Sequence, residues 1–155
     1  MRKALIATIL VALCVCVTAQ ANPFGNVLEG SGRTSPICRG QNNIVTCNRQ
    51  DEHGYSLRIS TTTVTVGVPV YAKGHGYIIK ALFTVKQVPG ASKAITPNHA
   101  DSIMLYAGIY CDQNFTGAIM CVPNTVTGYG IEIDTHHVVV LNVTTGQMVF
   151  SKVVP

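Results

Sequence analysis

Apolar and polar residues alternate along most of the chain after residue 37, which is the pattern of half-buried β-strands. The clearest stretch places Val64, Val66 and Val68 on one face and threonine or glycine on the other. Valine and threonine are branched at Cβ and favour pleated surfaces. No apolar period of 3.6 residues persists for three turns. The pattern therefore predicts an all-β fold.

A Gly-rich turn at residues 73–76 predicts a β-hairpin between two such stretches. In its second stretch, residues 77–88, alternate residues form the better core face: Ile79, Ala81, Phe83 and Val85. The Val–Thr alternation belongs to a longer stretch, residues 55–70, in which residues 56–60 also alternate, and the other strands are expected at residues 43–47, 103–111, 119–122, 130–143 and 147–154. About seven to eight short strands predict an antiparallel β-sandwich or a small β-barrel. The pattern indicates no internal repeat at a fixed spacing.

Residues 1–21 have the order of a cleaved secretory signal peptide: a positive start, an apolar run and an A-x-A site at Ala19 and Ala21. The apolar run, residues 4–17, is shorter than the roughly 20 residues that a membrane-spanning helix needs. No other stretch is long enough, so no membrane span is expected. We expect a secreted, extracellular protein that begins after Ala21.

The chain after the signal peptide is expected to form a flexible arm at residues 22–36, rich in Gly, Ser, Pro and Asn, and one β domain at residues 37–155. Without its first 21 residues the chain has nine Lys or Arg and seven Asp or Glu, a net charge of +2. That charge is too small and too scattered to indicate a nucleic-acid partner.

Four cysteines remain after processing: Cys38, Cys47, Cys111 and Cys121. An even number in an exported chain predicts two disulfides. The pairs Cys38–Cys47 and Cys111–Cys121 are favoured because each encloses a short loop with turn residues. A crossed or nested pairing that ties the ends of the domain together stays open. Asn114-Phe-Thr and Asn142-Val-Thr are candidate glycosylation sites.

Glu132, Asp134 and His136 are the best candidates for chemistry. Residues two apart on a strand point the same way, about 6.6–7 Å from one to the next, so the three would share one face of the expected strand. This set suits a Ca²⁺ or Zn²⁺ ion, or the acid and base of a small secreted hydrolase. A solvated sheet face is the alternative interpretation, and no cofactor is required.

Function is expected to lie in loops, because loops on a β scaffold commonly carry binding residues. We expect a non-catalytic binding or interaction protein with a protein or glycan partner outside the cell. Its role would lie in host interaction, in defence or toxicity, or in extracellular matrix. The candidate contact residues come from the Gly-rich turn and from the loop at residues 91–102: Lys73, His75, Tyr77, His99 and Asp101.

Residues 109–117, IYCDQNFTG, resemble the tyrosine-to-phenylalanine-x-glycine corner of a βγ-crystallin-type motif, which some secreted calcium-binding proteins and protease inhibitors share. That family's fold normally needs the motif at least twice, and the chain has no second copy. The resemblance implies a secreted protease inhibitor or a structural protein rather than an enzyme.

Overall fold

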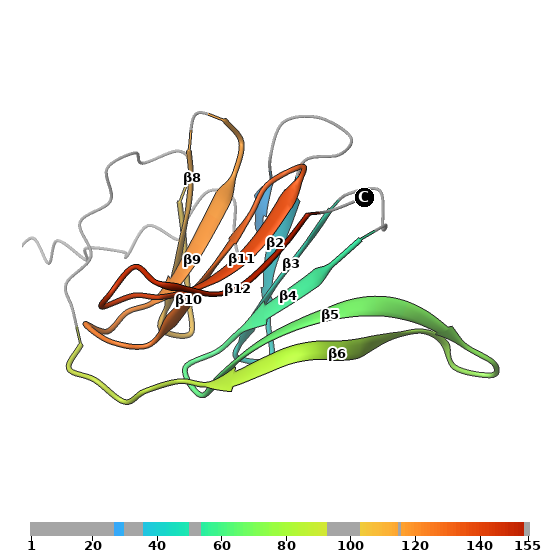
Figure 1. The fold of residues 1–155 in the computed structure, drawn as a ribbon, viewed down its shortest axis with the longest axis horizontal. Helices are drawn as coiled ribbons and strands as arrows, with labels where there is room; N and C mark the ends of the chain where they lie inside the picture. Colours follow the sequence, from blue (N-terminus) through green and yellow to red (C-terminus); the bar gives the residue numbers. More distant parts are fainter. Residues whose placement is uncertain (1–26, 30–35, 50–53, 93–102, 115, 154–155) are drawn as a thin grey trace, which may run out of the picture.

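A computed structural model of the chain describes residues 27–29, 36–49, 54–92, 103–114 and 116–153. The expected signal peptide lies outside the described residues, as do His99 and Asp101. Within the described part, twelve strands form two six-stranded antiparallel sheets (Figure 1). The expectation of an all-β fold is confirmed. No helix in the described part is long and apolar enough to cross a membrane.

Each sheet is a meander, because every strand pairs with its neighbours in the chain. The first sheet contains β1 (Val27–Glu29), β2 (Pro36–Gln41), β3 (Ile44–Arg49), β4 (Ser56–Ile59), β5 (Thr63–Ala72) and β6 (Gly76–Lys86). The second contains β7 (Ile103–Tyr106), β8 (Ile109–Gln113), β9 (Ile119–Pro123), β10 (Tyr129–Ile133), β11 (His137–Asn142) and β12 (Met148–Val153). The strand β1 lies within the segment that was expected to be a flexible arm.

The expected count of seven to eight strands is wrong, partly because two long strands are in fact hairpins. Residues 103–111 are interrupted at Ala107 and Gly108, whose φ angles of +48° and +79° turn the chain. Residues 130–143 are interrupted after Ile133, and the chain turns through Asp134 into β11. Single residues with left-handed backbone are enough to end a strand, and the alternating pattern runs on through them.

No internal repeat at a fixed spacing was expected, and the two sheets nevertheless share a short stretch of similar sequence. Six of the thirteen residues at positions 54–66 recur 74 positions later, at positions 128–140. The matched pairs are Gly54/Gly128, Tyr55/Tyr129, Ile59/Ile133, Thr61/Thr135, Val64/Val138 and Val66/Val140. Both glycines have left-handed backbone, with φ angles of +95° and +112°. We call residues 27–86 the first repeat and residues 103–153 the second repeat.

The strand registers place the repeats in one-to-one correspondence. A row of directly paired residues crosses all six strands of each sheet and contains both cysteines of that sheet; we call it the cysteine row. In the first repeat it is Leu28, Cys38, Cys47, Leu57, Val66 and Phe83. In the second it is Met104, Cys111, Cys121, Ile131, Val140 and Phe150. The favoured disulfides, Cys38–Cys47 and Cys111–Cys121, are confirmed and occupy equivalent places.

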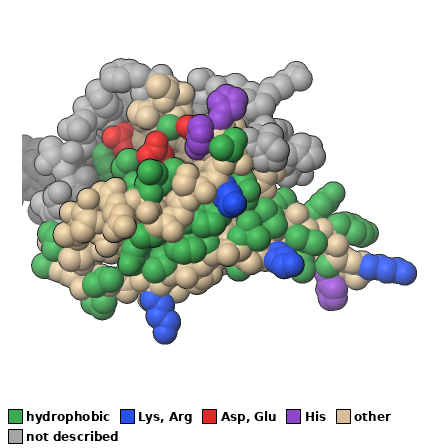
Figure 2. Space-filling view, viewed as in Figure 1, with side chains coloured by type: hydrophobic (Ala, Val, Ile, Leu, Met, Phe, Trp, Pro, Cys, Tyr) green, Lys and Arg blue, Asp and Glu red, His purple; other side chains and the backbone are tan. Residues whose placement is uncertain are grey.

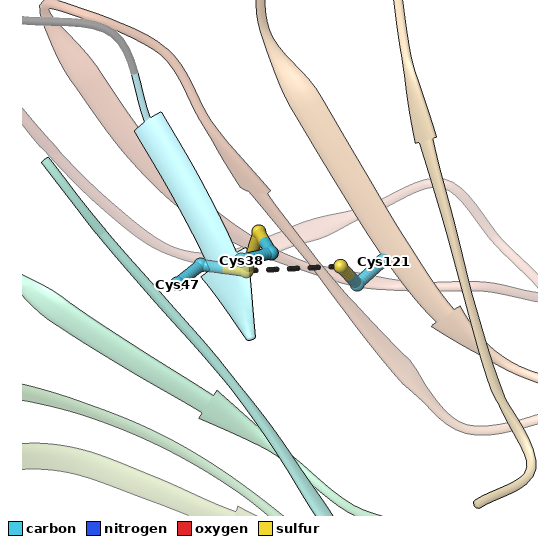
Figure 3. Close-up of side chains that lie close together, drawn as sticks. All are labelled: Cys38, Cys47 and Cys121. Carbon is cyan, nitrogen blue, oxygen red and sulfur yellow. Dashed lines mark hydrogen bonds between the residues drawn. A yellow bond between two sulfur atoms is a disulfide. The ribbon is translucent and has the colours of Figure 1, made fainter. Parts of the chain in front are cut away.

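The two cysteine rows contact each other at equivalent residues. Cys47 Sγ lies 3.8 Å from Cys121 Sγ, so the two disulfides touch (Figure 3). The rings of Phe83 and Phe150 lie 5.1 Å apart between their centroids. Contacts between equivalent residues are what a two-fold axis between two like units produces. All four cysteines are fully buried, in one cluster with apolar residues of both sheets.

Local features repeat as well. Both sheets have a register shift at the same place, after Val66 in the first repeat and after Val140 in the second. In the first repeat Ser60 Oγ accepts hydrogen bonds from the backbone N–H groups of Thr62 and Thr63. In the second repeat Asp134 Oδ1 accepts the equivalent bonds from the N–H groups of His136 and His137. Short side chains of this kind close such turns.

Candidate functional site

The largest difference between the repeats is the length of one hairpin. Sixteen residues separate Val66 from Phe83, whereas nine separate the equivalent Val140 and Phe150. Strand β4 pairs with β5 only as far as Gly67, so the rest of β5 pairs with β6 alone among the described strands. We call residues 68–80 the hairpin arm. At about 3.4 Å per residue it extends roughly 17 Å beyond the sheet (Figure 1).

Apolar and aromatic side chains are exposed along the hairpin arm. Tyr71 and Tyr77 pair across it, with ring centroids 5.7 Å apart in an edge-to-face arrangement, yet they are 67% and 75% exposed. Val70 pairs with Ile78, and both are exposed. Of the expected core face, Ile79, Phe83 and Val85 are only half-buried and Ala81 is exposed. Exposed apolar residues that gather on one projecting element commonly mark a contact surface.

The charge of the hairpin arm is entirely positive. From residue 53 to residue 100 the sequence contains no Asp or Glu. The arm itself contains Lys73, His75 and Lys80, all of them exposed. Figure 2 shows basic side chains at the projecting end and also elsewhere on this face, and acidic side chains gathered on another part of the surface. Of the expected contact residues, the structure places Lys73 and His75 in the turn of the arm and Tyr77 directly after it.

A shallow groove lies on the second sheet. It crosses β8, β9 and β10 and has a volume of about 230 Å³. Its walls are Tyr110, Met120 and Val122, and it is flanked by the carboxylates of Asp112 and Glu132. The Oδ1 atom of Asp112 is buried, and none of the described residues forms a hydrogen bond with it. Burial, then the charge of Asp112 and a hydrogen bond with its side chain, raise the pKa of Tyr110 above its usual value.

The acidic residues of the groove have basic counterparts in the first repeat. A second row of paired residues crosses each sheet one position away from the cysteine row, so it lies on the opposite face of the sheet, and we call it the charged row. In the second repeat Asp112, Met120 and Glu132 stand side by side in it. The equivalent residues of the first repeat are Arg39, Thr46 and Arg58. The two sheets therefore present opposite charge at equivalent positions.

The expectation that Glu132, Asp134 and His136 share one face of a continuous strand is wrong. Strand β10 ends at Ile133, and the Asp134 carboxylate accepts backbone hydrogen bonds within the turn. Glu132 instead lines the groove, and His136 is exposed. The carboxylate of Asp134 therefore stabilises the turn, whereas the expected metal ion or acid–base pair would need it as a ligand or as a proton acceptor.

The one group of three metal-ligating atoms within 4.8 Å of one another in the described part of the chain is made of Cys38, Cys47 and Cys121. Their sulfur atoms are joined in disulfides, so they carry no thiolate for a metal ion. The candidate glycosylation residues both lie at turns. Asn114 is exposed and Asn142 is half-buried, and the Oδ1 atom of each accepts backbone hydrogen bonds.

The groove and the apolar part of the arm were missed by the interpretation of the sequence. The signal for the arm is the run of apolar residues in β5 that continues past Gly67, where the pairing with β4 stops. The groove can be recognised in the sequence only after the repeats are aligned, because Asp112 and Glu132 then correspond to basic residues of the first repeat.

Comparisons with protein-family models, with curated proteins and with solved structures gave no match. The resemblance of residues 109–117 to a βγ-crystallin corner therefore gains no support from a family match. In the structure, that segment forms β8 and the turn toward β9.

Proposed function

We propose that this protein is a secreted, non-catalytic interaction protein that contacts its partner through the hairpin arm. The observation that carries the proposal is the difference between the repeats. The second hairpin is the short form of the same element, and the first extends it by seven residues with exposed apolar and basic side chains. An isolated two-stranded ribbon is marginal in water by itself, so the arm adds little to the stability of the fold.

Secretion is supported by two features. Disulfides form and persist in oxidising compartments, and both pairs of cysteines are bonded. Residues 1–21 have the order of a signal peptide. The same proposal makes Asn114 a surface position that is open to glycosylation in a eukaryotic secretory pathway.

For the architecture we take the two sheets as the layers of a β-sandwich. Support comes from the contact of the two disulfides, from the stacking of Phe83 against Phe150, and from the single buried cluster shared by both sheets. The side chain of Gln87 adds a polar link, because it hydrogen-bonds Ser60 O of the first repeat and the Tyr129 backbone of the second. In this arrangement the arm projects from one edge of a rigid body.

A hydrolase or a protease inhibitor is less well supported. The carboxylate of Asp134 accepts backbone hydrogen bonds in its turn. Glu132 lies in β10 and His136 lies in the turn before β11, so the three residues do not share one strand. The hairpin arm is exposed, but paired strands do not offer a single extended segment for a protease to grip.

The test is to exchange the arm for the short hairpin of the second repeat. In this arm-exchanged variant, residues 67–82 are replaced by the nine residues found at positions 141–149. The protein without its first 21 residues is immobilised and incubated with extracellular fluid from its source. We expect a specific partner to be retained by the wild type and lost from the arm-exchanged variant.

The matched control is His136→Ala, which changes an exposed residue at another turn. Retention of the same partner by the arm-exchanged variant, with loss on His136→Ala, contradicts the proposal.

A further inference from the structure

The groove on the second sheet has the size and chemistry of a receptor for side chains. Its volume of about 230 Å³ is below the roughly 300–1,000 Å³ of typical small-molecule sites. A space of that size accommodates one or two side chains of a protein. The groove combines the apolar surfaces of Tyr110, Met120 and Val122 with two carboxylates and the amide of Asn114, a lining that suits an occupant with an apolar part and a cation.

The carboxylates are suited to a cationic partner. The carboxylates of Asp112 and Glu132 stand on either side of Met120 on neighbouring strands, so a cation placed there meets two negative charges. The second repeat contains three acidic residues and one lysine between Ile103 and Val153. The hairpin arm of the first repeat contains two lysines, one histidine and no acid. The two surfaces are therefore complementary in charge.

The hairpin arm also matches the groove in shape and apolar character. It projects from the body, whereas the basic residues of the first sheet, Arg39 and Arg58, lie on the sheet surface with Thr46 between them. Ile78 lies on the same face of β6 as Lys80 and is exposed, and Tyr71 and Tyr77 are exposed on the opposite face. Within one molecule the tip of the arm points away from β8 and β9 (Figure 1), so it does not reach its own groove.

We propose that the partner of the arm is a second copy of this chain, whose groove receives the arm tip. This inference rests on the proposed function and names its partner. Ile78 enters the groove against Met120, while Lys80 on the same face and Lys73 in the turn face Asp112 and Glu132. The contact joins two different surfaces, so it is heterologous and gives a closed ring or an open chain of molecules. A contact limited to one hairpin tip is small, so the assembly is concentration-dependent and sensitive to salt.

The experiment uses two charge-reversed forms of the disulfide-bonded protein without its first 21 residues. The arm-reversed form carries Lys73→Glu and Lys80→Glu. The groove-reversed form carries Asp112→Arg and Glu132→Arg, which are the residues that the first repeat has at the equivalent positions. Sedimentation velocity is measured over a wide concentration range at low ionic strength, and circular dichroism checks that each form is folded.

We expect the wild type to assemble with rising concentration and each reversed form alone to assemble at least about tenfold more weakly. An equimolar mixture of the two forms restores assembly, because each arm then meets a groove of opposite charge. The matched control, Arg58→Glu with Lys152→Glu, changes the same net charge at sites outside the contact and assembles as the wild type does.

A wild type that stays monomeric at every concentration overturns the inference, and so does a mixture that stays monomeric. Loss of assembly in the Arg58 and Lys152 control, with assembly intact in the arm-reversed form, also overturns it, because the first sheet would then be the occupant. Binding of the arm to vesicles of phosphatidylcholine with phosphatidylserine, without self-assembly, identifies a lipid surface as partner and rejects the second copy. Failure in any of these ways leaves the proposed function standing if the arm-exchanged variant still loses its extracellular partner.

Discussion

The two repeats keep the same interior and differ in what they present outside. Every member of the cysteine row in one repeat has an apolar or cysteine counterpart in the other, and the rows contact each other at Cys47 and Cys121. The charged row, by contrast, exchanges Arg39 and Arg58 for Asp112 and Glu132. A buried position tolerates little change of volume or polarity, whereas a surface position tolerates most substitutions. The buried cysteine rows therefore stabilise the fold in both repeats, whereas the charged rows give the two sheets opposite surface charge.

Removal of a disulfide should cause the largest loss of unfolding free energy, and the loss should be the same in both repeats. The loops closed by the two bonds differ by one residue, with separations of nine and ten. Loop closure then predicts a loss of about 3 kcal/mol of unfolding free energy for Cys38→Ala with Cys47→Ala, and nearly the same for Cys111→Ala with Cys121→Ala. Urea denaturation measures both. Losses that differ by more than about half of that value would show that the repeats are not equivalent in energy.

A smaller loss is expected at Gln87, which joins the repeats. Its Nε2 donates to the carbonyl oxygens of Ser60 and Tyr129 at 3.1 and 3.0 Å, and its Oε1 accepts from the Tyr129 N–H at 2.7 Å. Gln87→Ala leaves these backbone groups without a partner and should lower the unfolding free energy by about 1–3 kcal/mol. The control is Gln147→Ala, at an exposed position, which should change stability by less than about 0.5 kcal/mol. Equal losses would mean that the Gln87 bonds are replaced by water.

The exchange of the hairpin arm should have little effect on stability. The arm-exchanged variant gives the first repeat the hairpin of the second and removes mostly exposed side chains. We expect its unfolding free energy to stay within about 1 kcal/mol of the wild type. Thermal denaturation followed by circular dichroism measures the change. A variant that no longer folds would show that the arm is part of the core rather than an added contact element.

The smallest expected effect is on the pH dependence of the unfolding free energy, through Tyr110 in the groove. The pKa of Tyr110 is raised by burial, by the negative charge of Asp112 and by their hydrogen bond. A raised pKa in the folded state favours folding below pH about 10, and that contribution is lost as the pH rises through the folded-state pKa. Asp112→Asn lowers the Tyr110 pKa and should reduce this alkaline loss of stability. Urea denaturation between about pH 8 and 11 tests it, and an identical pH dependence in both proteins would contradict it.

Much of the scaffold could be predicted from the sequence. The alternation of valine and threonine in β5 indicated the strand, and the Gly-rich turn indicated the β5–β6 hairpin. The disulfide pairing followed from the short loops between cysteines. The strand count was wrong because Ala107 and Asp134 end strands through local backbone conformation and turn hydrogen bonds, which leave the apolar pattern undisturbed.

The repeat and the groove were harder to predict for one shared reason. The spacing of 74 relates the repeats only from Cys47/Cys121 to Val66/Val140; it is 76 at Leu28/Met104, 73 at Cys38/Cys111 and 67 at Phe83/Phe150, so no fixed spacing reveals the repeat. Asp112 and Glu132 lie twenty residues apart in the sequence, and Met120 comes between them only through strand register. Pairing across strands is a long-range property, so the groove appears once the register is known.

The most direct test of the account compares hydrogen exchange of the two equivalent hairpins. Backbone amide exchange is measured for the wild type at low and high protein concentration, with peptides that cover residues 68–80, residues 110–122 and residues 141–149. We predict that exchange slows at high concentration in the hairpin arm and in the groove, and that the short hairpin of the second repeat is unchanged. Protection of residues 141–149 with no change in residues 68–80 would contradict the claim that the extended hairpin is the contact element.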